Sequence, residues 1–458
     1  MNINTANSTI FHMKSAIQNL TKDNELPFSN VLSVQSINEQ LNDVTFRARV
    51  FSPDVTVFAF LSQVLGQDQS CQAAVAQVIA QNAKQEKAIL SANTSAYCQA
   101  RARLPEALLS NLAKESAKDL EEQARPEWLW RGRHIKIPDG TTVSMPDTSE
   151  NQAAYSQHPS QKPGIGFPIA RLVGVFSLAT GALLDLAITS WSGKKTGEHA
   201  LLRQLMHVFQ SGDIVLRDAY YASFFLIAMF IKMQVDVVFP IHACRGYDFR
   251  RGARLGKRDH LVQWKKPRKP EWMDEQTYAE FPDNITIREG AITDAKRGYR
   301  TKRRILVTTL INSKQVTLQD LVELYGYRWF VELDLRSIKE IMNMDILRSK
   351  TPMMVHKEIW AHILAYNLIR KIMIQAAVIH QRNPREMSFK LALQMVFAFR
   401  QTGIFSERDE KIYAYFTEAI THKVVGNRSS RSEPRMVKRR PKAFPRLQKP
   451  RDFYCKVA

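Results

Sequence analysis

The apolar pattern of the chain changes from a helical to a strand period near residue 126, and the segments that follow restrict the possible folds most. HIKIPDGTTVSMP, RLVGVFSLATG and ALLDLAITSW each have the short, β-rich pattern of a strand. Gly181 lies between the last two, as expected for a turn that joins antiparallel neighbours. GEHALLRQLMHVFQ then predicts a helix, DIVLRD a buried strand, SFFLIAMFIKMQ a second helix and DVVFPIHA a further strand.

Three strands in a meander followed by alternating helices and strands predict an α/β fold whose mixed sheet is covered on both faces. This order is the one expected of a ribonuclease-H-like core. After His242 the alternation stops, and the composition of residues 244–304 predicts a β-rich insertion. The core resumes with the strand RRILVTTLI, followed by a long helix over about 318–344 and apolar helices over about 356–380.

The first 125 residues have helical periodicity. Two apolar-periodic pieces meet at Gly66, and Ser70 is placed to cap the second. Such a pair is either a helix-turn-helix that enters a DNA groove or plain packing in a small bundle. We therefore expect five regions: a helical N-terminal domain that is a candidate for DNA binding (1–125), the first part of the core (126–243), a basic β-rich insertion (244–304), the second part of the core (305–380), and a C-terminal region with a basic tail (381–458).

The positive charge of the chain is gathered into two segments. The 458 residues include 65 Lys and Arg and 44 Asp and Glu, a net charge of +21. Residues 244–304 hold 17 basic and 9 acidic side chains (net +8), and residues 426–458 hold 11 and 2 (net +9). Charge in blocks indicates a polyanionic partner, usually nucleic acid, although a solvated face with a flexible tail is the alternative. Residues 426–458 have too little apolar content to fold unaided.

Other features exclude several classes of protein. Hydrophobic residues make up 45% and charged residues 24%, a balance that excludes a wholly disordered chain. The longest near-apolar run, residues 219–231, is too short to cross a bilayer, and the N-terminus does not resemble a secretory signal. The four cysteines are far apart and form no CxxC pair, which disfavours a zinc site or a disulfide framework. We expect an intracellular, cytoplasmic protein.

Three carboxylates form the candidate catalytic set. Asp139 and Asp218 follow strands whose ends should meet at one edge of the sheet, and Glu332 lies on the later long helix. Two Asp and a Glu can hold two Mg²⁺ ions about 3.5–4 Å apart, and their hard oxygens favour Mg²⁺ or Mn²⁺ over zinc. The two aspartates also have simpler interpretations. Asp139 could belong only to a turn, in which case Asp147 would be the first acid of the set, and Asp218 could be a helix cap.

The segment LYGYRWFVELDLRSIKE carries a polar stripe. On one continuous helix, Tyr325, Arg328, Glu332 and Lys339 fall within about 60° of each other. An exposed Glu–Arg pair four residues apart is common and often has no function beyond the helix surface. The upstream carboxylates Asp139 and Asp218 give Glu332 partners and favour the catalytic interpretation.

The spacing Y-x2-R-x3-E-x6-K resembles the signature of bacterial DDE transposases of the insertion-sequence-four type. The resemblance extends to DGTTV at Asp139, to VLRDAYY at Asp218, to the LVTTL strand and to the β-type insertion, and so spans most of residues 126–375. It implies that Asp139, Asp218 and Glu332 bind the metal ions. It further implies that Tyr325, Arg328 and Lys339 contact DNA phosphate near the cut end.

The resemblance also implies a reaction and partners. Members of that family excise an element at its terminal inverted repeats and insert it elsewhere, often through a hairpin intermediate, as a synaptic homodimer on double-stranded DNA. A flipped base stacks on a tryptophan of the insertion in that family, and Trp264 and Trp272 are both candidates for this position or for the core. In a bacterium the protein would be cytoplasmic, and associated with the nucleoid when bound to DNA.

Two alternative functions remain open from the sequence. One is a structure-selective nuclease on the same core, which would cleave without joining, and the other is a DNA-binding protein without catalysis. The three retained acids disfavour the second. Nearby, we expect Glu198 and His199 to cap a helix and His134 to be structural.

Overall fold

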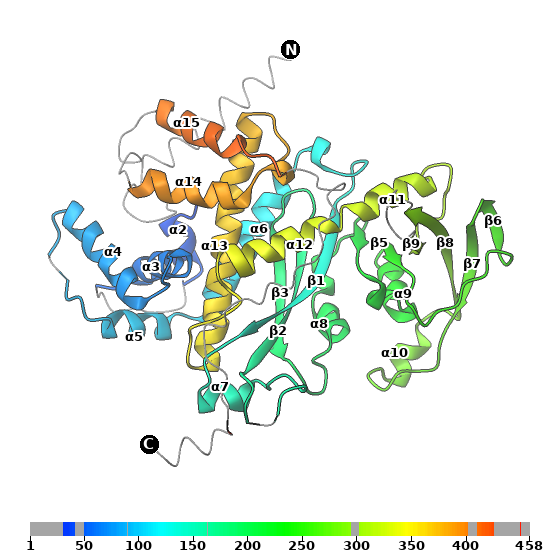
Figure 1. Ribbon diagram of the computed structural model, residues 1–458, viewed down its shortest axis with the longest axis horizontal. Helices are drawn as coiled ribbons and strands as arrows, with labels where there is room; N and C mark the ends of the chain where they lie inside the picture. The colour runs from blue at the N-terminus through cyan, green and yellow to red at the C-terminus, as the bar shows by residue number, and fades with distance from the viewer. Residues whose placement is uncertain are drawn as a thin grey trace.

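A large mixed sheet organises the molecule. The computed structural model describes residues 31–41, 50–88, 90–162, 164–294, 302–401, 410–425 and 449. Within them, a nine-stranded sheet has the order β3-β2-β1-β4-β5-β9-β8-β7-β6 (Figure 1). The strands are β1 Ile135–Ser144, β2 Ile169–Ser177, β3 Leu183–Ser190, β4 Ile214–Leu216, β5 Asp236–Pro240, β6 Ala253–Gly256, β7 Asp259–Lys265, β8 Asn284–Asp294 and β9 Lys302–Thr308.

The first five strands follow the predicted order. β1, β2 and β3 form an antiparallel meander, and β4 and β5 are parallel to β1. Gly181 makes the turn between β2 and β3 with φ +73°, a left-handed conformation that glycine adopts without strain. The predicted meander and the alternation that follows it are both confirmed.

Both faces of this part of the sheet are covered, as predicted. In β4, Ile214 and Leu216 lie in the apolar core that also contains the long helix α13, whereas Val215 lies in a second core. That second core contains side chains of α8 (Glu198–Gln204) and α9 (Phe224–Lys232). Adjacent side chains of β4 lie on opposite faces of the sheet because the side chains of a strand alternate with a two-residue period.

The helices before the sheet confirm the helical periodicity within the described residues; residues 1–30 and 42–49 lie outside them. Gly66 caps the C-terminus of α3, and the Ser70 side chain accepts a hydrogen bond from the amide of Ala73 at the start of α4, as predicted. The helices are α2 Val34–Glu39, α3 Pro53–Leu65, α4 Cys71–Lys84, α5 Ser95–Arg103 and α6 Glu106–Glu122. A short 3₁₀ turn, Pro126–Trp128, leads into β1.

Helix α13, Pro352–Ile379, runs through the middle of the molecule (Figure 1). It packs against α3, α6, α14 and α15. By length and composition it could cross a membrane, yet 78% of its most apolar window is buried inside the protein. The remaining helices are α7 Ser149–Ala154, α10 Glu275–Ala279, α11 Leu318–Gly326, α12 Trp329–Arg336, α14 Phe389–Gln401 and α15 Glu410–Thr421, with 3₁₀ turns at Met206–Val208, Ala219–Tyr221 and Pro384–Glu386.

The basic segment 244–304 is β-rich in its described part and continues the same sheet. β9 pairs antiparallel with both β5 and β8, and β7 and β6 extend the sheet beyond β8. The two tryptophans here differ: Trp264 is buried and donates its indole N–H to Glu289, whereas Trp272 is 43% exposed.

The predicted helix over 318–344 is not continuous. α11 ends at Gly326, α12 begins at Trp329, and a π-helical turn follows at Ser337–Ile341. The backbone amides of residues 327, 328, 330 and 331 bond three residues back, as Arg328 does to Tyr325 and Val331 to Arg328. This tighter winding, beside a glycine that disfavours helix, interrupts the 3.6-residue period. The prediction of one straight helix was therefore wrong.

Candidate active site

Asp139 lies in the middle of β1, not at its end as predicted. It pairs with Gly174 of β2 on one side. On the other side β1 pairs with β4 only at Ile135 and Lys136, so the edge of β1 beyond these residues is free of β4. Burial raises the pKa of Asp139 above its ordinary value, against the opposing effects of Arg217 and Arg328. The short β4 thus opens a position for a carboxylate inside the sheet.

Asp218 follows the end of β4 by two residues. Its side chain accepts a hydrogen bond from the amide of Tyr220 at 3.1 Å and so caps a 3₁₀ turn, which confirms the cap interpretation. It also faces the cluster around Asp139, because its charge contributes to raising the pKa of that group. Capping and membership of the site are therefore compatible for Asp218.

Arg328 connects two of the acids. Its Nη2 donates to Glu332 Oε1 at 2.5 Å, and its Nη1 lies 3.8 Å from Asp139 Oδ2. Glu332 is in the first turn of α12, which packs against β1. One guanidinium thus joins a carboxylate from the sheet to a carboxylate from the helix.

The other predicted residues are placed as follows. Tyr325 is buried at the end of α11, and burial raises its pKa; it faces Arg328 and Asp218. Lys339 lies half-buried on the π-helical turn after α12. Asp147, the rival of Asp139, lies after β1 and accepts a hydrogen bond from Gln152 at 2.6 Å. The ion pairs with Arg217 and Arg328 are made by Asp139.

Sequence reasoning missed Arg217, the residue before Asp218. Its side chain is 1% exposed, and burial lowers its pKa to about 10. Nη1 donates to the carbonyl of Pro138 and lies 3.6 Å from Asp139 Oδ1. This contact connects the strand that carries Asp139 to the turn that carries Asp218. The signal for it was the Arg-Asp pair at the end of a buried strand.

Glu198 and His199 have other contacts than the predicted caps. Gly197 occupies the cap position of α8. Glu198 accepts a hydrogen bond from the Tyr221 hydroxyl and lies 3.8 Å from Arg217 Nη2. His199 contacts the carbonyl of Tyr220 at 2.9 Å. The capping prediction was therefore wrong for both side chains, and Glu198 belongs to the site.

His134, predicted to be structural, contacts Glu121 at 3.1 Å, and this hydrogen bond raises the pKa of the imidazole. The contact joins the last helix before the sheet to the residue that precedes β1. Its role in packing α6 against the sheet is the one expected.

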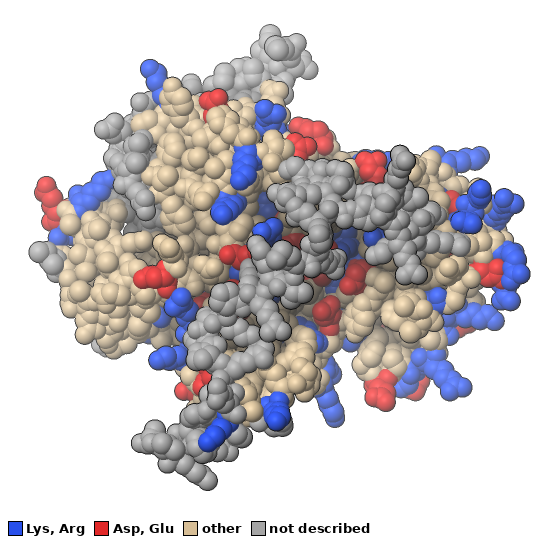
Figure 2. Space-filling view, in the orientation of Figure 1, with Lys and Arg blue, Asp and Glu red and all other residues tan. Residues whose placement is uncertain are grey.

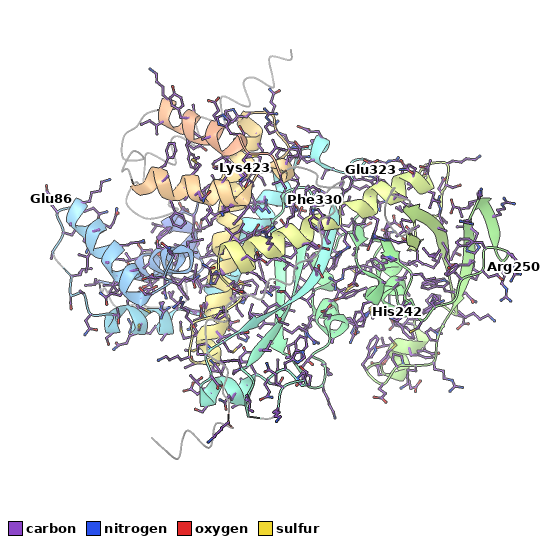
Figure 3. All side chains as sticks on the ribbon, viewed as in Figure 1. Glu86, His242, Arg250, Glu323, Phe330 and Lys423 are labelled. Carbon is purple, nitrogen blue, oxygen red and sulfur yellow. The ribbon has the colours of Figure 1, made fainter. Side chains whose placement is uncertain are left out.

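A buried network fixes α12. The Asp334 carboxylate contacts Arg370 at 2.5 Å and Arg385 at 2.8 Å, and all three side chains are buried. In Figure 3, Phe330 marks α12 and Glu323 marks α11. The Arg385 guanidinium lies 4.9 Å from the centroid of the Phe330 ring. This network holds the helix of Glu332 onto α13 and was not predicted.

The donor set matches a hard divalent cation. Asp139, Asp218 and Glu332 offer carboxylate oxygens, the ligands that Mg²⁺ and Mn²⁺ prefer. In the part of the chain that the structure describes, no three acidic, His or Cys side chains are yet close enough to hold an ion together. The contacts of Arg328 identify it as the group that would have to move from Asp139 and Glu332 for these acids to close on a cation.

Basic side chains gather over the end of the molecule that carries β6 to β8 (Figure 2). The Arg250 side chain there is 91% exposed and the Arg251 side chain 85% exposed. Figure 3 places Arg250 at the outer edge of this region. The basic tail over 426–458 lies outside the described residues except for Lys449.

Comparison with known proteins gives matches of one kind. A family model described as a transposase DDE domain matches residues 130–368. The chain is 29% identical over 364 residues to transposase InsG for insertion sequence element IS4 of Escherichia coli (strain K12), which covers 78% of each chain. Among solved structures it is similar to the piggyBac transposase synaptic complex with hairpin DNA, with a TM-score of 0.43 and 9% identity over 91% of this chain and 86% of that chain.

Proposed function

The chain belongs to the family of transposases with a DDE domain and is a DNA transposase, and from this premise we propose that it cleaves DNA at terminal inverted repeats and joins the released ends to a target. The observation that carries the proposal is that Arg328 pairs with both Asp139 and Glu332, that Arg217 pairs with Asp139, and that the charge of Asp218 acts on both Asp139 and Arg217. One acid from a strand, one from the turn after a strand and one from a helix, placed around the buried Arg217 and the partly buried Arg328, suit a phosphodiester substrate.

We assign residues 126–243 and 305–380 to a ribonuclease-H-like core. The order β3-β2-β1-β4-β5, with three antiparallel and two parallel strands, supports this assignment. The helical region before it, the β-rich extension over 244–304 and the C-terminal region from 381 would then be additions to this core.

In this proposal Asp139, Asp218 and Glu332 hold Mg²⁺ or Mn²⁺. A bound divalent ion would activate a water or hydroxyl and stabilise the leaving oxygen of the phosphodiester. The protein itself orients the acids. Asp334, on the same helix as Glu332, fixes α12 through its pair with Arg370, and Arg217 connects β1 to the turn that carries Asp218. Arg328 exchanges its carboxylate partners for a DNA phosphate as the acids close.

Tyr325, Arg328 and Lys339 are proposed to contact phosphate near the cut end. The exposed arginines of 244–304 and the tail over 426–458 would hold the flanking duplex through its phosphates. Trp272, half-exposed and with the Arg203 guanidinium 3.9 Å from its ring centroid, is the better candidate for stacking on a base than the buried Trp264.

For the helical region, α3 is nearly all buried, whereas α4 exposes polar side chains such as Gln72 and Gln77. Amide side chains of this kind can read base edges. We therefore assign the reading role, if the pair is a helix-turn-helix, to α4.

The active form is proposed to be a homodimer that joins two element ends, in the bacterial cytoplasm and on the nucleoid.

The test incubates the purified protein with Mg²⁺, DNA that carries the ends of its parent element, and a target plasmid. We expect both cleaved and joined products. Asp139→Asn should abolish both, whereas Asp147→Asn, its matched control, should retain them. Cleavage without joined products would identify a nuclease. If the wild-type protein binds the ends but forms neither product, it is a DNA-binding protein without catalysis.

A further inference from the structure

Arg217 is buried more completely than its hydrogen bonds justify. One nitrogen, Nη1, donates to the Pro138 carbonyl, but Nε and Nη2 have no hydrogen-bond partner among the described residues. The guanidinium lies 3.2 Å from the centroid of the Tyr221 ring. A buried cation with unsatisfied donors is costly, so its environment must supply compensating charge.

Two carboxylates share that compensation. Asp139 Oδ1 lies 3.6 Å from Nη1, and Glu198 Oε2 lies 3.8 Å from Nη2. Arg217 therefore stands between one acid of the proposed metal site and one acid outside it. The unsatisfied Nη2 lies on the side of the second.

Glu198 is held at this position by the residues around it. The Tyr221 hydroxyl donates to its Oε2. Gly140, the neighbour of Asp139, leaves room for it, because a Cβ at that position would lie 2.6 Å from Glu198 Cδ. The carboxyl of Glu198 thus lies directly against the strand that carries Asp139.

Glu198 changes the net charge of the cluster of acids and arginines. Asp139, Asp218, Glu198 and Glu332 contribute four negative charges when ionised, and Arg217 and Arg328 contribute two positive charges. With Arg328 in place the six groups sum to −2. Without Glu198 the sum is −1, and Arg217 would have Asp139 as its nearest remaining acid.

We propose that Glu198 is a fourth acid of the catalytic site, a positioning residue that takes up the charge of Arg217 and leaves Asp139 and Asp218 free to bind the divalent ion. This rests on the metal site of the proposed function. Glu198 would act through Arg217 and not through the substrate. Its effect should therefore appear in metal affinity before any DNA is added.

The experiment measures Mn²⁺ binding to the full-length protein without DNA by isothermal titration. Glu198→Gln should weaken Mn²⁺ binding by about tenfold, whereas Glu198→Asp, which keeps the charge, should bind Mn²⁺ within about threefold of the wild-type affinity. Tyr221→Phe, which removes the hydroxyl that holds Glu198, should weaken it by about twofold to threefold. Glu122→Gln, an exposed carboxylate paired with Lys118, is the matched control and should bind Mn²⁺ as wild type does.

The outcomes separate the two proposals. Loss of binding in Asp139→Asn together with wild-type affinity in Glu198→Gln and Tyr221→Phe would overturn the role of Glu198 and leave the metal site standing. Unchanged binding in Asp139→Asn would overturn the metal site itself. As a second readout, cleavage by Glu198→Gln should recover as Mn²⁺ is raised; a lowered melting temperature without any change in metal affinity would indicate a structural role only.

Discussion

Arg217 and Arg288 are the two largest fully buried side chains among the described residues, one in each half of the sheet, and their surroundings differ. Arg288 donates to both Asp259 oxygens, at 2.8 and 2.6 Å, and to the carbonyl of Val316 at 2.6 Å. Arg217 has one hydrogen bond and two acids at 3.6 and 3.8 Å. Every guanidinium nitrogen of Arg288 has a hydrogen-bond partner, as expected of a side chain that holds the fold, whereas two nitrogens of Arg217 have none and need another explanation.

The same contrast describes the two halves. The half around β8 and β9 is an antiparallel extension, locked internally by Asp259–Arg288 and by the contacts of Glu289 with Trp264 and His260, and basic on its surface. In the half around β1 and β4 the pairing of the two strands ends at Lys136, and Asp139 and Asp218 lie just beyond it. The fully paired arginine and the proposed catalytic acids therefore lie in different halves of one sheet.

The largest effect on folding should come from the paired arginine. Asp259→Asn leaves Arg288 buried without its counter-charge and should lower the free energy of unfolding by about 3–5 kcal/mol. Urea denaturation measures this. The matched control is Asp283→Asn, whose side chain is 88% exposed and whose pair with Lys266 should contribute less than about 1 kcal/mol. A decrease below about 1 kcal/mol in Asp259→Asn would break the contrast between the two arginines.

A smaller effect is expected on DNA binding at the other half. Arg328→Ala should weaken binding of the element end by about 1–3 kcal/mol, because a charged hydrogen bond to phosphate is removed. Electrophoretic titration without divalent metal measures it. Arg336→Ala is the control on the same helix, since Arg336 pairs with Glu340 at 3.1 Å. Equal affinities for both variants would make Arg328 a purely structural partner of Glu332.

The smallest and least specific effect concerns the tail. Truncation before Gly426 removes 11 basic and 2 acidic residues. Affinity for end DNA and for random DNA should fall by similar factors, and the slope of log K against log salt should flatten by roughly 0.9 for each phosphate that the tail no longer neutralises. A lowered melting temperature with an unchanged salt slope would instead indicate that the tail braces the core.

Much of the fold could be predicted because it depends on local periods. The strand patterns at HIKIPD and DIVLRD, the turn at Gly181 and the cap at Ser70 depend on a few neighbouring residues. The break between α11 and α12 depends on amides that bond three residues back, which leaves no mark on apolar spacing. The prediction of one straight helix failed for that reason.

The three candidate acids could be proposed from the sequence, but their surroundings could not. Asp139, Asp218 and Glu332 were recognised by residue type, order and a signature spacing. Glu198 reaches Tyr221 across 23 residues, and Asp334 reaches Arg385 across 51. Contacts of this kind arise only when the sheet and helices have assembled, so no local pattern predicts them.

The most direct test of the account is single-turnover cleavage of end DNA by Glu332→Gln, with Glu340→Gln from the neighbouring π-helical turn as control. We expect Glu332→Gln to slow cleavage by a factor on the order of 10³ or more, because one ion loses its ligand, while end binding without metal stays within about threefold of wild type. Glu340→Gln should cleave at the wild-type rate. Cleavage by Glu332→Gln at the wild-type rate would contradict the assignment of the catalytic acids.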